Sequence, residues 1–293
     1  MEFVTNKVAF LGPAGTFTEI AARAFLPDAK RMPYKDIPST LHALEKNQVD
    51  AAVVPLENTI EGSVNISLDY LIHKHDFPII GEVAIPIAQH LLVHPAVNDL
   101  HDIDTVYSHP HAIAQCHEFI TGELDEVEQK FATSTAQAAR EVSENEHTNI
   151  AAIANELAAE KYGLKVIQEN IHDFTNNHTR FVLVSPNDVA PSFLKANEQH
   201  SKTKVVVTLP SDFSGALHQV LSAFAWRKLN LTKIESRPTK TGLGNYFFII
   251  DVEHAYDEVL LPGALEELKA LGCETRVLGT YPSLFVQVKE RSL

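Results

Sequence analysis

The segment 177–181, Asn-His-Thr-Arg-Phe, places two side chains suited to handling a small acid next to each other. The Thr179 hydroxyl can donate and accept hydrogen bonds, and the Arg180 guanidinium carries a rigid fork of donors that matches a carboxylate. The apolar run 182–184 follows directly, which is typical of a buried strand with polar groups at its end. The pair suits a small acid that carries a hydroxyl group as well as a carboxylate. On composition alone such residues more often end a turn and form a surface ion pair. The rest of the sequence is therefore needed to show whether the pair belongs to a functional site.

Polar residues also follow three further predicted strands, which cover residues 50–55, 105–108 and 128–132. In open α/β sheets, ligands bind beyond the carboxyl ends of the strands. The polar side chains at these ends are therefore candidates to contact a substrate, and the local alternative is a turn or a helix cap. They are Asn58, Thr59, Ser108, His109, Ser134 and Thr135.

A turn at 12–16 joins the apolar run 8–11 to a helix that is expected to reach Phe25. Thr16 is a plausible N-cap, and Glu19 three residues later completes a capping box. Backbone amides at such a junction can hold an anion, and a tight turn without a ligand explains the same residues about as well. The Lys-Ser/Thr ending of a phosphate loop is missing.

Metal binding is not indicated by the histidines or the cysteines. The spacing of His109 and His111 would suit two ligands, but no Cys, Asp or Glu lies at ligand spacing nearby, and a turn entering a helix explains the pattern. Cys116 and Cys273 stand far apart among apolar neighbours, as expected of packed thiols in a reducing compartment. We expect no metal site.

Composition excludes several function classes. The formal charge of −14 argues against nucleic acid and against an anionic membrane surface, because both require a dense positive face. The start of the chain has no basic and apolar leader, and no stretch reaches the roughly 18 apolar residues of a membrane span. A cytoplasmic protein is expected.

The order of predicted elements indicates two kinds of domain. Strands and helices alternate over 1–185, which favours a largely parallel sheet and two α/β lobes with a cleft between them. The polar segment 186–202, with two prolines, is expected to be a linker. Over 203–282 the order is βαββαβ, with a Gly-rich turn at 241–245, as in ferredoxin-like domains. Residues 283–293 are expected to form a tail.

Taken together, these stretches resemble prephenate dehydratase with a C-terminal ACT domain. The resemblance covers nearly the whole chain, and its specificity comes from the number and order of the motifs. They lie at residues 12–17, 55–62, 108–110, 134–136, 177–181, 215–217 and 235–238. The resemblance implies an α/β fold: a two-lobed catalytic region like type II periplasmic binding proteins, followed by a ferredoxin-like ACT domain.

The resemblance also implies the reaction and the roles of the central residues. Prephenate would lose carbon dioxide and water to give phenylpyruvate on the route to phenylalanine, with no cofactor and no metal. Thr179 would donate to the departing ring hydroxyl. Arg180 would either hold a carboxylate or lock the loop by pairing with Glu57. Phe181 belongs to the same motif and would pack under the loop or touch the substrate.

The ACT domain implies feedback regulation by phenylalanine bound between two subunits of a homodimer or homotetramer. Gly215 would let backbone amides approach the effector, and polar contacts would come from the end of a strand. The expected effector site is Gly215, Ala216, Leu217, Glu235, Ser236, Arg237 and Pro238.

Three departures from the family pattern bear on these expectations. Thr59 stands where Ser is frequent, His111 where Gln is frequent, and Ser214 where Pro often precedes the Gly-Ala-Leu motif. Ser214 is expected to supply an N-cap instead. Two alternatives stay open: arogenate in place of prephenate as the substrate, and a sensor without catalytic activity built from a binding cleft and an ACT module.

Overall fold

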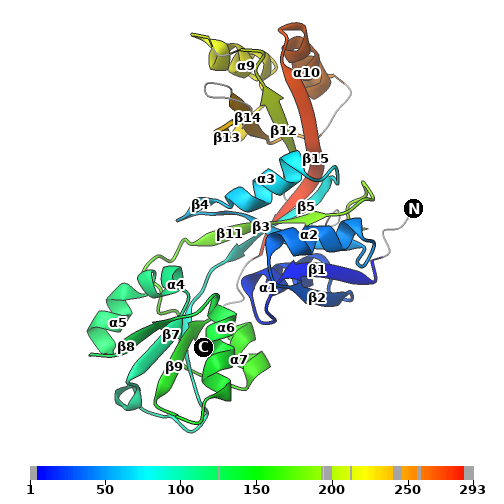
Figure 1. Cartoon of the computed structure of the whole chain (residues 1–293). Coiled ribbons are helices and arrows are strands. Elements are labelled where there is room, and N and C mark those ends of the chain that lie inside the picture. Colours follow the sequence, from blue (N-terminus) through cyan, green and yellow to red (C-terminus); the bar gives the residue numbers. More distant parts are fainter. Residues whose placement is uncertain are drawn as a thin grey trace. The chain divides into compact units, whose positions relative to one another are not determined.

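The computed structural model describes residues 5–124, 126–192, 194, 200–211, 213–239, 246–255 and 259–286. They form two compact units. The larger unit comprises 5–67, 84–181 and 286, and the smaller unit comprises 68–83 and the described part of 182–285. Among these residues no helix is long and apolar enough to cross a membrane. Figure 1 shows the elements coloured along the chain, from blue at the N-terminus to red at the C-terminus.

One sheet region of the larger unit has the strand order β11-β3-β1-β2. Its strands are β1 (Lys7–Leu11), β2 (Lys30–Tyr34), β3 (Ala51–Asn58) and β11 (His178–Val184). β1 pairs in parallel with both β2 and β3. The sequence did not predict β2, because it mixes charged residues with Pro33 and buries no side chain, as an edge strand can.

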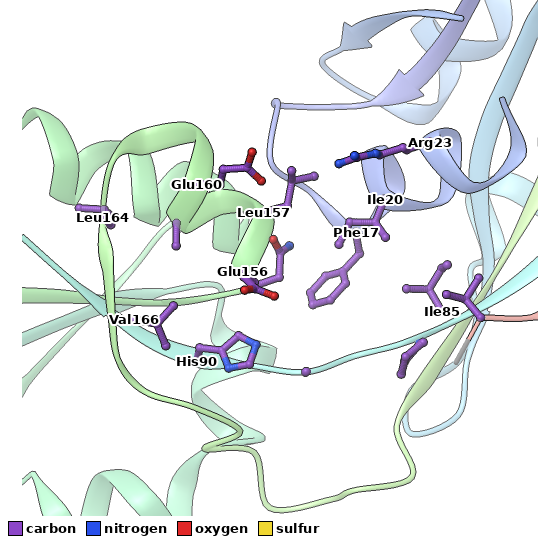
Figure 2. Close-up of a pocket in the computed structure, with 15 residues that line it drawn as sticks. Phe17, Ile20, Arg23, Ile85, His90, Glu156, Leu157, Glu160, Leu164 and Val166 are labelled. Atoms are coloured by element: carbon purple, nitrogen blue, oxygen red, sulfur yellow. The ribbon is translucent and has the colours of Figure 1, made fainter. Parts of the chain in front are cut away.

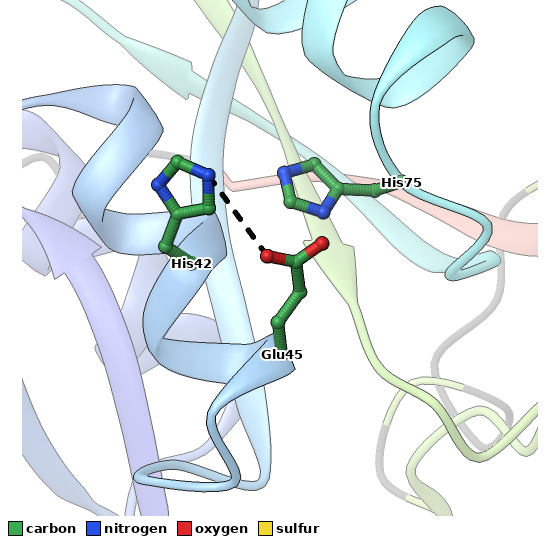
Figure 3. Close-up of side chains that lie close together, drawn as sticks. All are labelled: His42, Glu45 and His75. Atoms are coloured by element: carbon green, nitrogen blue, oxygen red, sulfur yellow. Dashed lines mark ion pairs between the residues drawn. The ribbon is translucent and has the colours of Figure 1, made fainter.

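Helices α1 (Phe17–Phe25) and α2 (Ile37–Glu45) connect these strands. The start of α2 is fixed by a capping box between Asp36 and Ser39, whose hydrogen bonds lower the pKa of the Asp36 carboxyl. Figure 3 shows an ion pair near its end between His42 and Glu45, at 3.9 Å; His75, drawn in the same view, belongs to the smaller unit.

The second sheet of the larger unit has the order β10-β6-β9-β7-β8. Its strands are β6 (His90–Val93), β7 (Thr105–Ser108), β8 (Glu128–Phe131), β9 (Ile150–Ala154) and β10 (Lys165–Gln168). β7 is parallel to β8 and β9, whereas β6 is antiparallel to both β9 and β10. The largely parallel arrangement expected from the sequence therefore holds for β7, β8 and β9 but not for β6, whose preceding strand β5 (Ile79–Pro86) is not part of this sheet.

Helices cover both faces of this second sheet. They are the short η1 (Leu100–Asp102), α4 (Pro110–Ala114), α5 (His117–Glu123), α6 (Thr135–Glu144) and α7 (Glu156–Tyr162). Leu91 and Val93 pack on the side of α4 and α5, while Leu92 between them packs on the side of α6 and α7. This alternation buries both faces of β6.

The single helix expected over 112–121 is two helices, α4 and α5. The break has a local cause: the Asp173 carboxylate accepts hydrogen bonds from the amides of His117, at 3.0 Å, and Glu118, at 3.2 Å. A carboxylate on these amides gives α5 an N-terminus of its own.

The smaller unit contains the expected βαββαβ order. Its elements are β12 (His200–Thr208), α9 (Ala216–Ala225), β13 (Leu231–Pro238), β14 (Tyr246–Val252), α10 (Leu260–Ala270) and β15 (Glu274–Phe285). The strands form an antiparallel sheet in the order β13-β14-β12-β15. Val205, Val207 and Phe248 pack with Leu261 of α10 in one core.

Two strands of this domain are longer than expected. β12 begins at His200, inside the expected linker, and β15 runs to Phe285, inside the expected tail. The two pair along their length from Thr208↔Glu274 to His200↔Ser283. The sequence did not predict the extension of β12, because residues 200–202 are polar. The Gly-rich turn 241–245 lies outside the described residues.

Three elements continue from one unit into the other along the chain: α3 (Asn65–His73), β5 and β11. The short strand β4 (Gly62–Ser63) precedes α3 and pairs with the end of β3. The loop that follows β3 is thereby held close to the strand before it.

Candidate active site

Thr179 lies in β11, which neighbours β3 in the sheet. Its hydroxyl accepts a hydrogen bond from Asn58 Nδ2 at 2.9 Å. The side chain is nearly buried, with 9% of its residue surface exposed. Among the hydrogen bonds of the described residues, Thr179 Oγ1 only accepts, so its own proton remains available to donate.

Asn58 ends β3 and fixes the geometry around that hydroxyl. Its Nδ2 also donates to Asn177 Oδ1 at 2.8 Å. Its Oδ1 accepts from the amides of Ile60 at 2.9 Å and Glu61 at 3.1 Å, which shapes the following turn. The amide orientation of Asn58 is therefore set from both sides, and its NH2 group must face Thr179.

Thr59 joins the same loop to β11. Its amide donates to the carbonyl of His178 at 2.9 Å, and its hydroxyl accepts from the amide of His178 at 2.6 Å. Because the hydroxyl is engaged by backbone, the Thr59 side chain holds the loop beside the strand that carries Thr179. Its substrate contact stays a prediction.

Arg180 pairs with Glu57, with 2.7 Å between Nη1 and Oε2. Along β11 the residues alternate between buried Thr179 and Phe181 and half-buried His178 and Arg180. Neighbouring side chains in a strand point to opposite faces, so Arg180 leaves the strand on the face opposite to Thr179. This geometry favours the locking role over direct binding of a carboxylate beside Thr179.

Residues from α4 and its end reach the loop after β3. Gln115 Nε2 donates to Glu61 Oε1 at 3.4 Å, and Asn177 Nδ2 donates to Gln115 Oε1 at 3.1 Å. His111 forms an ion pair with the other oxygen of Glu61 through Nδ1. Hydrogen bonds thus run from Thr179 through Asn58 and Asn177 to this group. Sequence reasoning missed Asn177, Glu61 and Gln115; the first two lie inside recognised motifs, and Gln115 gave no signal.

His109 is the N-cap of α4, where its Nδ1 accepts from the amide of His111 at 3.3 Å. Burial lowers the pKa of His109, the neighbouring His111 lowers it further, and Glu61 acts in the opposite direction. This local role matches the helix-entry interpretation of the sequence. Contact with substrate stays a prediction.

We expect the pKa of His109 in the folded protein to lie below the ordinary value of 6.5. Because the pKa is lowered on folding, the folded protein favours the neutral imidazole. The contribution of His109 to the stability of the fold is therefore complete above about pH 6.5 and is lost as the pH falls through the folded pKa. An NMR titration of the imidazole checks this, with the His109→Asn variant, which retains a capping side chain, to assign the signal. A midpoint at or above 6.5 would contradict the expectation.

The remaining predicted substrate residues have structural partners. Ser108 is fully buried and donates to the carbonyl of Ile153 at 2.6 Å. Ser134 is the N-cap of α6 and accepts from Gln137, and Thr135 is the first residue of that helix. Phe181 is buried. Direct contact between these side chains and a substrate stays a prediction.

The turn at 12–16 binds its own chain. Thr16 is the N-cap of α1, as expected, but Glu19 accepts from the amide of Gly15, at 2.7 Å, and not from that of Thr16. The Gly15 carbonyl in turn accepts from Asn155 at 2.9 Å. The carboxylate of Glu19 occupies the amide that an external anion would use, which favours the tight-turn interpretation.

A cavity of about 590 Å³ opens elsewhere in the larger unit (Figure 2). Its wall is largely apolar, including Phe17 and Leu157, with Arg23, Glu156 and Glu160 among its charged residues. None of its lining residues is Asn58, Thr59 or a member of 177–181. The cavity is therefore separate from the Thr179 site.

The predicted effector residues lie on two elements of the smaller unit. Gly215 is the N-cap of α9 in the left-handed conformation, with φ 94°, and no side chain caps this helix. The expected N-cap role of Ser214 is therefore wrong, since the left-handed position one residue later begins the helix and favours glycine. Ala216 is buried and Leu217 is exposed in the first turn.

The second group lies in β13, where exposure alternates. Glu235 and Arg237 are half-buried, and Ser236 and Pro238 are exposed. Arg237 forms ion pairs with Asp69 of α3 at 2.9 Å and with Glu235 at 3.7 Å. The guanidinium predicted to contact an effector is thus bound to α3 in this structure.

Comparison with known proteins gives consistent results over both parts of the chain. A model of the prephenate dehydratase family matches residues 8–189, and a model of the ACT domain matches residues 203–273. A prephenate dehydratase of Bacillus subtilis strain 168 is 52% identical over 281 residues, which cover 94% of this chain and 99% of that protein.

Two solved structures have similar folds. Prephenate dehydratase from Arthrobacter aurescens, in complex with L-Phe, is 38% identical with a TM-score of 0.83, over 94% of this chain and 90% of that one. GqqA, described as a novel type of quorum quenching acylase, is 28% identical with a TM-score of 0.82, over 95% and 98% of the two chains.

Proposed function

This chain belongs to the prephenate dehydratase family and carries an ACT domain, and from that premise we propose that it converts prephenate to phenylpyruvate, carbon dioxide and water. One observation at the site supports the proposal most strongly. The nearly buried Thr179 hydroxyl accepts from Asn58 and keeps its proton available, so it is set up as a donor.

The chemistry requires such a donor. Prephenate carries a carboxylate on one ring carbon and a hydroxyl on the ring carbon opposite. When the bond to the carboxylate breaks, carbon dioxide leaves and the electron pair enters the ring, which expels the hydroxyl and becomes aromatic. One proton completes the departing water. Aromatisation drives the reaction, so the protein must orient the ring and stabilise the oxygen as it leaves.

The residues divide this work between them. Thr179 donates a hydrogen bond to the departing oxygen; a hydroxyl is a weak acid, so it stabilises the transition state and solvent supplies the net proton. Asn58 orients Thr179. Arg180 and Glu57 hold β11 beside β3, since their ion pair joins the two strands.

The proposal is tested by incubating the purified full chain with prephenate or arogenate and measuring phenylpyruvate or phenylalanine formation. We expect turnover of prephenate with release of one carbon dioxide per ring. Turnover of arogenate alone would show that arogenate is the substrate in place of prephenate. If neither compound gave a product, the result would support the alternative of a sensor without catalytic activity.

The ACT domain is proposed to bind phenylalanine between two subunits of a homodimer or homotetramer. Two features of the described residues support an interface: β13 stands at the end of the sheet order, and Phe213, Leu217 and Ile234 are exposed apolar side chains in the same domain. Sedimentation of the protein with and without phenylalanine checks this. A monomer under both conditions would contradict it.

A cytoplasmic location is also part of the proposal. It is supported by Cys116 and Cys273, both buried as free thiols. Cys116 packs in the core, and burial raises the pKa of its thiol to about 12, which disfavours the reactive thiolate.

A further inference from the structure

Helix α3 is bound at its C-terminal half by three strands of the ACT sheet, all within the smaller unit. Arg237 of β13 pairs with Asp69 at 2.9 Å. The ring of Phe247 of β14 meets His73 edge-on, with 5.6 Å between centroids. Arg276 of β15 reaches the end of the helix. The sheet therefore holds the side and the end of α3.

The Arg276 contact is a helix C-cap supplied by a distant strand. Nη1 donates to the carbonyl of Ile72, in the last turn, at 2.7 Å, and Nη2 donates to that of His75, two residues past the helix, at 2.9 Å. The last carbonyls of a helix lack intrahelical partners, and a cation is favoured at the negative end of the helix dipole. Arg276 satisfies both requirements with one side chain.

These contacts use the sheet face that α9 and α10 leave open. In β12 the core beneath those helices contains Val205 and Val207, so Val206 points to the other face. Val206 and Phe247 line a cavity of about 360 Å³ together with Ile72, His73 and Arg276. The helix thus covers the second face of the sheet without filling all the space beneath it.

The opposite end of α3 is tied to the proposed active site. Ser67, in its first turn, donates to the carbonyl of Pro55 at 2.5 Å, and the amide of Val64 donates to the carbonyl of Leu56 at 2.9 Å. Pro55 and Leu56 lie in β3, three and two residues before Asn58. The short turn from Asn58 to β4 therefore connects the Thr179 contact directly to the start of the helix.

We propose that α3 couples the ACT sheet to the active site, and that Arg276 and Asp69 are positioning residues that transmit the effect of phenylalanine to Asn58. The inference rests on the proposed function, since it requires prephenate turnover that phenylalanine inhibits. Rearrangement of the sheet upon effector binding would move or release the helix end, and the first turn would carry that change to the loop that orients Thr179.

The measurement is the ratio of the prephenate KM with saturating phenylalanine to the KM without it, together with phenylalanine binding by calorimetry. For the parent enzyme we expect a ratio of about 5 to 150, the usual range of allosteric coupling. Arg276→Met should bring the ratio close to 1, while kcat without effector and phenylalanine affinity change by less than about fivefold.

Arg276 also forms an ion pair with the exposed Asp76 at 2.9 Å. Arg227→Met is the matched control, because Arg227 likewise bonds a carbonyl and a carboxylate, those of Ala223 and Glu267, but lies with the helices on the other face of the sheet. It should keep the parent ratio. Should Arg276→Met fail to fold, Asp69→Asn removes the partly exposed partner of Arg237 and should lower the ratio at least threefold.

The outcomes separate the two proposals. A folded Arg276→Met or Asp69→Asn enzyme that keeps the parent ratio would overturn the coupling role while leaving feedback intact. A parent enzyme that turns over prephenate but neither binds nor responds to phenylalanine would overturn the proposed regulation, and the coupling with it.

Discussion

Replacing Thr179 by Val should lower kcat/KM for prephenate by about 10² to 10³, the usual effect of removing one preorganised hydrogen-bond donor from a transition state. Valine retains the shape of threonine, so the fold should persist. The loss should fall mainly on kcat, because the donor acts on an oxygen that gains charge only as it leaves. Steady-state kinetics with circular dichroism as a fold check measures both.

Two control variants make this result specific. Thr179→Ser restores a hydroxyl beside Asn58 and should retain activity within about tenfold of the parent. Thr59→Val weakens the loop tether without removing the proposed donor and should cost less than Thr179→Val. If Thr179→Val stays within about threefold of the parent enzyme, the assignment of Thr179 as the donor is wrong.

The second large effect is expected on stability. Lys204 and Asp251 form an ion pair between β12 and β14, and their side chains are 1% and 0% exposed. Asp251→Ala leaves the Lys204 ammonium buried without its carboxylate, and should lower the free energy of unfolding by about 3 to 5 kcal/mol. Urea unfolding of the full chain, followed by circular dichroism, measures the loss.

Its controls come from the same domain. Glu266→Ala breaks the exposed ion pair with Lys269 and should cost less than about 0.5 kcal/mol. The double variant Lys204→Met with Asp251→Leu removes both charges and should recover most of the stability, because an apolar pair avoids the desolvation of two ions. A loss below about 1 kcal/mol for Asp251→Ala would show that the pair is not isolated from water.

Sequence reasoning succeeded where local pattern determines structure. The polar ends of separate predicted strands were expected to face one cleft, and hydrogen bonds between β3 and β11 bring Thr179, Asn58 and Thr59 together, while their contact with substrate stays a prediction. The βαββαβ order of 203–282 was likewise confirmed, since alternation and helical periodicity mark each element strongly.

Sequence reasoning failed where contacts between distant parts of the chain determine the structure. Gln115 bonds Asn177, and Asp173 bonds the amide that begins the helix after it; both contacts join segments that are distant in sequence. The direction of β6 depends on the end of the sheet at which the chain enters. No residue within β6 specifies that end. The sequence left two roles open for Arg180, and the structure shows the pairing with Glu57. The pairing of Arg237 with Asp69 was not expected, because charge type alone does not specify a partner.

The crystal structure of the Thr179→Val variant with prephenate bound tests the central claim most directly, because slow turnover should preserve the substrate. We predict that the departing oxygen of the ring lies within about 4 Å of the side chain at position 179 and beside Asn58 Nδ2. Prephenate bound instead in the cavity lined by Phe17 and Leu157, with position 179 out of its reach, would contradict the account.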